Sequence, residues 1–181
     1  MEKFQRSEAG DSVYSAIGRA LTFATRFETS CFSLAFLMGS GKAFVAATES
    51  DRDQQFEALF ERNWHVLARN IQLFETSIPA KSGRFLRTVV RAKEARNDLV
   101  HKLTSSLDRQ GMTKVRQRSI MRRLERISLK LAAGDLVVCM LLYRQAGRDL
   151  LSDKAGMHLA PAYLEHVENW ICSLNPKSVE I

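Results

Sequence analysis

The segment from Phe85 to Leu107, FLRTVVRAKEARNDLVHKLTSSL, predicts a helix with one apolar face. Its apolar residues advance by three or four positions, which is the spacing of one helical face, and they are Phe85, Val89, Ala92, Leu99 and Leu103. The row is regular only if Arg96 fills the gap between Ala92 and Leu99. Because burying an unpaired charge is costly, Arg96 is expected to need an ion-pair partner, a polar cavity or an anionic ligand. A conflict of this kind between pattern and residue chemistry indicates a candidate functional site.

The rest of the chain shows the same helical periodicity. Its 181 residues suit one domain, and 45% hydrophobic and 26% charged residues are ordinary values for a globular protein. Few stretches alternate with period two. We therefore expect an all-α fold, a single-domain bundle of four to five helices over residues 1–181, with flexible ends at 1–11 and 176–181. The predicted helices are 12–38, 52–76, 85–107, 113–145 and 161–174.

Glycines set two of the expected helix boundaries. Gly39-Ser40-Gly41 is expected to end the first helix, and Gly134 to kink or divide the fourth. The stretch Gly39-Ser40-Gly41-Lys42 is not a phosphate-binding loop. That pattern needs Gly where Phe36 stands and Ser or Thr where Ala43 stands. In the second helix, aromatic and aliphatic residues at helical spacing predict an inner face of Phe56, Leu59, Phe60, Trp64, Leu67, Ile71 and Phe74.

The net charge of +7 is concentrated in one region. Residues 109–130 hold eight Lys and Arg against one acid, Glu125, so the remainder of the chain is neutral. A polyanion suits such a basic surface, although a solvated charged face and an acidic protein partner, such as an antitoxin, are alternatives. We predict RNA contacts from the basic helix and its neighbour, made by Arg91, Arg116, Arg122, Arg123 and Arg126.

Other features favour a cytoplasmic protein that does not span a membrane. The first ten residues lack the apolar core of a signal peptide, and the apolar stretches 31–39 and 136–143 are shorter than the roughly 20 residues of a membrane helix. Cys31, Cys139 and Cys172 are odd in number and widely spaced, as free thiols in a reducing compartment are. His158 and His166 have no metal-ligand spacing with Cys172, so no metal site or cofactor is predicted.

The run Arg96-Asn97-Asp98-Leu99-Val100-His101 combines two groups that suit RNA chemistry. An imidazole can take the proton of a 2′-hydroxyl, and a guanidinium can stabilise charge on phosphoryl oxygens. On an ideal helix, however, positions 96 and 101 lie roughly 140° apart. A joint site therefore needs a local helix irregularity, a cleft that wraps the helix, or a second copy of the helix at a two-fold axis.

This run resembles the Arg-x4-His motif of the HEPN-domain family (higher eukaryotes and prokaryotes nucleotide-binding). The resemblance implies a metal-independent endoribonuclease of toxin–antitoxin, phage-defence or RNA-processing systems. It also implies a homodimer whose two motifs share one cleft, with Arg96 and His101 catalytic and Asn97 assisting. Lys102 departs from the pattern, because a small residue often follows the histidine in the family.

Alternatives stay open for the protein and for each residue of the motif. The chain can be a non-catalytic helical module that binds RNA, a nucleotide or a protein, such as a scaffold or an antitoxin-like partner, or a DNA-binding helical protein. Arg96 can belong to an ion pair with Glu94 or with an acid from another helix. His101 can interact with carbonyls at a helix end. Asp98 is expected to be a structural partner rather than a catalyst, because a carboxylate repels phosphate.

Overall fold

A computed structural model describes residues 8–43, 67–77, 83–103, 113–145, 147, 161–167 and 169, with seven further positions between 51 and 61. The described elements are α1 (Glu8–Ala43), α3 (Leu67–Ser77), α4 (Gly83–Asn97), the π-helical segment η2 (Asp98–Leu103) and α6 (Lys114–Gln145). A short helix follows at 161–167. The predicted all-α bundle is confirmed. Within the described part of the chain, no helix is long and apolar enough to cross a membrane.

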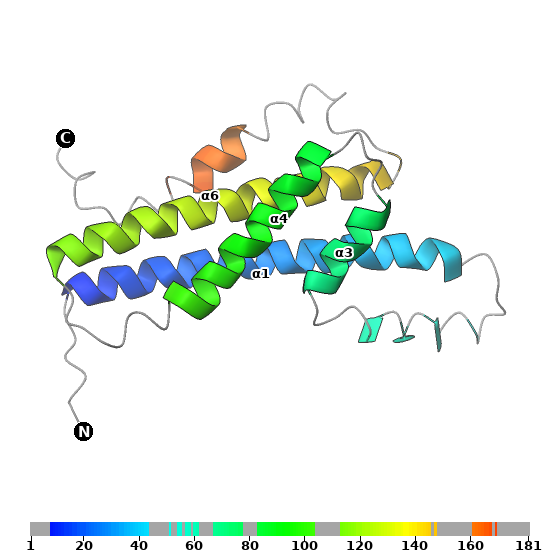
Figure 1. The fold of residues 1–181 in the computed structure, drawn as a ribbon, viewed down its shortest axis with the longest axis horizontal. Helices are drawn as coiled ribbons and strands as arrows, with labels where there is room; N and C mark the ends of the chain where they lie inside the picture. Colours follow the sequence, from blue (N-terminus) through cyan, green and yellow to red (C-terminus); the bar gives the residue numbers. More distant parts are fainter. Residues whose placement is uncertain are drawn as a thin grey trace.

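Two long helices, α1 and α6, form the base of the bundle and run side by side in the same direction (Figure 1). Near their N-termini, the Gln117 amide donates to the Ser12 hydroxyl at 3.1 Å. Further along both helices, the Ser30 hydroxyl donates to Asp135 at 2.6 Å. α4 crosses this pair obliquely, and α3 packs against α1 and α4 (Figure 1). The short helix at 161–167 lies beside α6 (Figure 1).

The core follows the predicted periodicity closely. On α1, the expected apolar positions are fully or partly buried: Val13, Ile17, Leu21, Ala24, Phe27, Cys31, Leu34 and Met38. On α4 and η2, Val89, Ala92, Leu99 and Leu103 are buried as predicted, whereas Phe85 at the start of the row is 40% exposed. α6 packs against both α1 and α4, and its apolar side includes Ile120, Leu124, Ile127 and Leu131.

Three expectations about helix ends and faces are wrong. α1 starts at Glu8 and continues through Gly39-Ser40-Gly41 to Ala43, so residues 8–11 are helical and the glycines do not stop the helix. Each helical glycine costs about 1 kcal/mol relative to alanine, which tertiary packing along a long helix can offset. On the predicted second helix, Ile71 and Phe74 are buried but Phe60 is exposed. The Phe60 ring lies edge-on to the Phe32 ring, with 5.3 Å between the two ring centroids. The side chains of Phe56, Leu59 and Trp64 lie outside the described residues.

Gly134 neither kinks nor divides α6, which is continuous from Lys114 to Gln145. It lies where three helices meet. A Cβ atom at this position would overlap the Cβ of Ala92 on α4 and approach Cε2 of Phe27 on α1 to 3.0 Å. The glycine is therefore required because α4 crosses α6 too closely for any side chain.

We predict that Gly134→Ala lowers the free energy of unfolding by about 1–3 kcal/mol, the usual cost of overpacking. The added methyl meets a Cβ attached directly to the α4 backbone, so relief requires the helix to move. Gly18→Ala is the matched control, because Gly18 lies in α1 with open space around it. That variant should be stabilised by about 0.5–1 kcal/mol. Urea unfolding measures both, and a Gly134→Ala protein as stable as wild type would contradict the close crossing.

Candidate functional site

The motif lies across the junction where α4 becomes π-helical. Arg96 and Asn97 end α4, whereas Asp98 to His101 belong to η2. A π-helix forms i→i+5 hydrogen bonds, so its turn holds more residues than an α-helical turn, and positions five apart lie closer together around the axis. The local helix irregularity that a joint Arg96–His101 site needs is therefore present within the motif. Leu99 and Leu103 are both buried and fix the π-helical segment to the core.

Arg96 finds its ion-pair partner on another helix. Its Nε donates to Oε1 of Glu28 on α1, which lies 68 residues earlier in the chain. Its Nη1 donates to the Asn97 side-chain oxygen at 3.3 Å. The side chain is 26% exposed, so it lies at the edge of the core rather than inside it. This arrangement agrees with the alternative of an acid from another helix, and it leaves the side chain partly exposed.

Asp98 joins the motif to the basic helix. Its carboxylate accepts hydrogen bonds from Nε and Nη2 of Arg123 on α6, at 3.1 and 2.6 Å. The Lys102 ammonium lies 4.0 Å away on η2. These contacts lower the pKa of Asp98, mainly through the hydrogen bonds from Arg123, with smaller contributions from Lys102 and Lys130. Asp98 has the structural role expected of it, and Arg123 already has a carboxylate partner.

The other predicted site residues lie on the same two adjoining helices. His101 and Asn97 are exposed, on η2 and at the end of α4. Arg91, Arg122 and Arg126 are also exposed, while Arg116 is half-buried in the first turn of α6. The fold thus brings the motif and the basic half of α6 together through the Asp98–Arg123 pair. Among the described residues, no three potential ligands from His, Cys, Asp and Glu gather where they could hold a metal ion.

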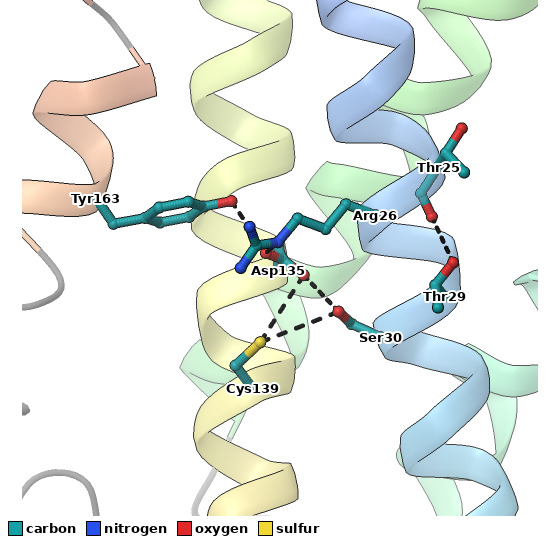
Figure 2. A network of polar contacts seen from close by, with 7 residues as sticks. All are labelled: Thr25, Arg26, Thr29, Ser30, Asp135, Cys139 and Tyr163. Carbon is teal, nitrogen blue, oxygen red and sulfur yellow. Dashed lines mark hydrogen bonds and ion pairs between the residues drawn. The ribbon is translucent and has the colours of Figure 1, made fainter.

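A second polar cluster surrounds the buried carboxylate of Asp135 (Figure 2). It accepts hydrogen bonds from the Ser30 hydroxyl at 2.6 Å, Arg26 Nε at 2.9 Å and the Tyr163 hydroxyl at 3.0 Å. The Arg26 guanidinium also lies over the Tyr163 ring, 5.2 Å from its centroid. The thiol of Cys139 lies 3.9 Å from Asp135. Sequence analysis missed this cluster, although Asp135 is the single acid in the apolar run 129–143.

The Asp135 cluster connects three elements of the fold. Burial raises the pKa of the Cys139 thiol, and burial together with Asp135 raises the pKa of the Tyr163 hydroxyl. Both groups are protonated at neutral pH, so neither is an activated nucleophile. The carboxylate is occupied by donors from α1 and from the short helix at 161–167 (Figure 2). It therefore ties these two elements to α6.

We predict that Asp98→Asn reduces stability at neutral pH and that the difference from wild type disappears in acid. The folded protein lowers the pKa of Asp98, so the ion pair's contribution is fully present above the ordinary carboxyl pKa of about 4. It is lost as the pH falls through the lower, folded-state pKa. Urea unfolding from pH 7 down to pH 2 measures this difference.

Glu94→Gln is the control for this pH series, because Glu94 is an exposed acid on α4 four residues earlier. Its effect on stability should be small at every pH. An Asp98→Asn variant whose difference from wild type stays constant between pH 7 and pH 2 would show that the Asp98–Arg123 pair does not stabilise the junction between η2 and α6.

No protein-family model, no curated protein and no solved structure matches this chain. The HEPN resemblance of the motif thus remains a prediction from six residues. The candidate site therefore comprises the motif residues Arg96, Asp98 and His101 and the basic half of α6 beside them.

Proposed function

We propose that the protein is a metal-independent endoribonuclease of HEPN type, acting as a homodimer in a toxin–antitoxin, phage-defence or RNA-processing system. The observation that carries this proposal is the π-helical segment within the motif. Positions five apart lie closer together around a π-helical axis, which supports a joint action of Arg96 and His101, and π-helical turns frequently occur at functional sites. The partly exposed side chain of Arg96 and the exposed His101 support it further.

Each group has a defined chemical role in this proposal. The His101 imidazole accepts the proton of the RNA 2′-hydroxyl, and that oxygen attacks the adjacent phosphorus. The bond from phosphorus to the 5′-oxygen breaks, and the partner's His101 protonates the leaving oxygen. Arg96 stabilises the charge on the non-bridging oxygens. The products are a 2′,3′-cyclic phosphate and a 5′-hydroxyl, and DNA is resistant because it lacks the attacking hydroxyl.

Glu28 has a positioning role in this scheme. By accepting the hydrogen bond from Nε of Arg96, it orients the guanidinium and leaves Nη2 to meet a phosphate oxygen. Asn97 assists through its contact with Nη1. Asp98 repels phosphate less than a free carboxylate would, because Arg123 pairs with it at two points.

A non-catalytic binding module is the second candidate, and one observation favours it. The Glu28 carboxylate competes with any phosphate for Arg96, because an arginine that already has an ion pair gains less from a second anion. In that case the basic helix binds RNA, a nucleotide or a protein without turnover.

We predict that the purified protein cleaves single-stranded RNA in the presence of EDTA. Arg96→Ala and His101→Ala should each lower the cleavage rate at least 100-fold, the lower range for loss of a general acid–base group. His166→Ala is the matched control, because His166 is an exposed histidine on the short helix at 161–167. The assay separates products on a denaturing gel.

Two results would decide against the enzymatic proposal. One is RNA that stays intact although it binds the protein, which would favour the non-catalytic module. The other is cleavage by the Arg96→Ala and His101→Ala variants at the wild-type rate, which would trace the activity to a different site or to a contaminant.

A further inference from the structure

Two basic side chains contact Asp98 beside the motif, and a third acts on it electrostatically. Arg123 donates two hydrogen bonds to it, and Lys102 lies 4.0 Å from it. Lys130 on α6 is close enough to contribute to the lowered pKa of Asp98. Lys102 is 75% exposed and Lys130 is also exposed. Because Asp98 neutralises one of the three cations, two positive charges are in excess at this point of the surface.

The basic residues of α6 extend this cluster along one side of the helix. Arg116, Arg123 and Lys130 follow one another at intervals of seven residues, so they share a row with steps of about 10 Å. Glu125 is two positions from Arg123 and lies on roughly the opposite side of the helix. On α4, Arg91 precedes Asp98 by seven residues and is exposed on the same side. The surface where α4, η2 and α6 meet is therefore cationic along its length.

We propose that Lys102, Arg123 and Lys130 form a binding subsite for a phosphate of the RNA backbone, with Asp98 orienting Arg123 within it. The inference deepens the proposed function and relies on it for the choice of RNA as the polyanion. Asp98 occupies Nε and Nη2 of Arg123, so Nη1 is the nitrogen that meets the phosphate. The two lysines supply point charges on either side.

The subsite holds a phosphate next to the one that reacts. Lys102 directly follows His101 in η2, and Arg123 and Lys130 lie on the α6 side of that segment. Arg96 lies on the α1 side of the motif, where its guanidinium pairs with Glu28. A strand whose scissile phosphate lies at Arg96 and His101 would therefore place a flanking phosphate against α6. Losing this subsite weakens RNA binding rather than the chemical step. The basic helix that the sequence predicts to contact RNA includes Lys130, whereas Lys102 stands out in the sequence only as a departure from the motif. The carboxylate of Asp98 that links both lysines to the motif is apparent only once η2 packs against α6.

The test is a binding measurement on the full chain. The probe is a fluorescein-labelled, single-stranded RNA with 2′-O-methyl groups, which binds but offers no free 2′-hydroxyl for attack. Lys102→Gln combined with Lys130→Gln should raise the Kd at least tenfold in fluorescence anisotropy at low salt. The slope of log K against log salt should become shallower by about 0.7, because the subsite neutralises one phosphate and each lost phosphate contact contributes that much for a single strand.

The control removes the same charge elsewhere. Arg69→Gln combined with Arg144→Gln changes two exposed arginines, on α3 and in the last turn of α6, and should change the Kd by about twofold or less. Equal losses in the two double variants would overturn the subsite, because binding would then follow net charge alone. An unchanged Kd for the Lys102/Lys130 double variant would overturn it as well.

Competition identifies the ligand class. Unlabelled RNA should displace the probe at lower concentration than poly-glutamate of equal charge or duplex DNA of equal length. If poly-glutamate or the duplex competes as well as RNA, the assignment to an RNA phosphate is wrong.

Failure of the subsite can be distinguished from failure of the proposed function. If binding is tight and depends on Lys102 and Lys130 but unmodified RNA is not cleaved, the subsite is supported and the proposed ribonuclease activity is wrong. If the Lys102/Lys130 double variant cleaves RNA and binds it like wild type, the activity is supported and the subsite is wrong.

Discussion

The close crossing of α4 over α6 at Gly134 is the constraint on which the geometry of the motif depends. It places Gly134 of α6 against Ala92 of α4 and next to the ring of Phe27 of α1, so the three helices meet at this point. Beyond this crossing, two motif residues that are two positions apart lie on roughly opposite sides of their helix. Arg96 consequently meets Glu28 of α1, whereas Asp98 meets Arg123 of α6. The motif is thus attached to both neighbours by ion pairs.

These two ion pairs lie on either side of the position where the α-helix becomes a π-helix, between Asn97 and Asp98. The π-helical segment starts at Asp98, two residues after Arg96, which pairs with Glu28, and its apolar side is buried through Leu99 and Leu103. The exposed side of the same segment carries His101 and Lys102. A buried inner side with an imidazole and an ammonium group on the outside is compatible with the proposed phosphate site. This is why the proposed chemistry and the proposed flanking subsite share one short segment.

Periodicity predicted much of this fold because core positions on long helices repeat regularly, as Val13 to Leu34 on α1 show. It also showed that Arg96 needs a partner. It could not identify Glu28, because an acid 68 residues earlier looks like any surface residue until the two helices pack. Gly134 was misread as a kink for the same reason, since only the approach of Ala92 explains it. The π-helical segment has no sequence signal of its own. The Asp135 cluster could not be predicted either, because its members meet only when α1 and the short helix at 161–167 pack against α6.

The proposed homodimer makes the motif half of a site that a second copy completes. Mixed dimers test this most directly: wild-type and His101→Ala chains carrying different tags are co-expressed, the mixed dimers are purified through both tags, and RNA cleavage is measured in EDTA. Each mixed dimer keeps both Arg96 side chains but a single His101, so it lacks either the proton acceptor or the proton donor of the shared site. We expect its cleavage rate to fall to that of the His101→Ala homodimer. Mixed dimers that keep half of the wild-type rate would contradict the shared site, because each chain would then act alone.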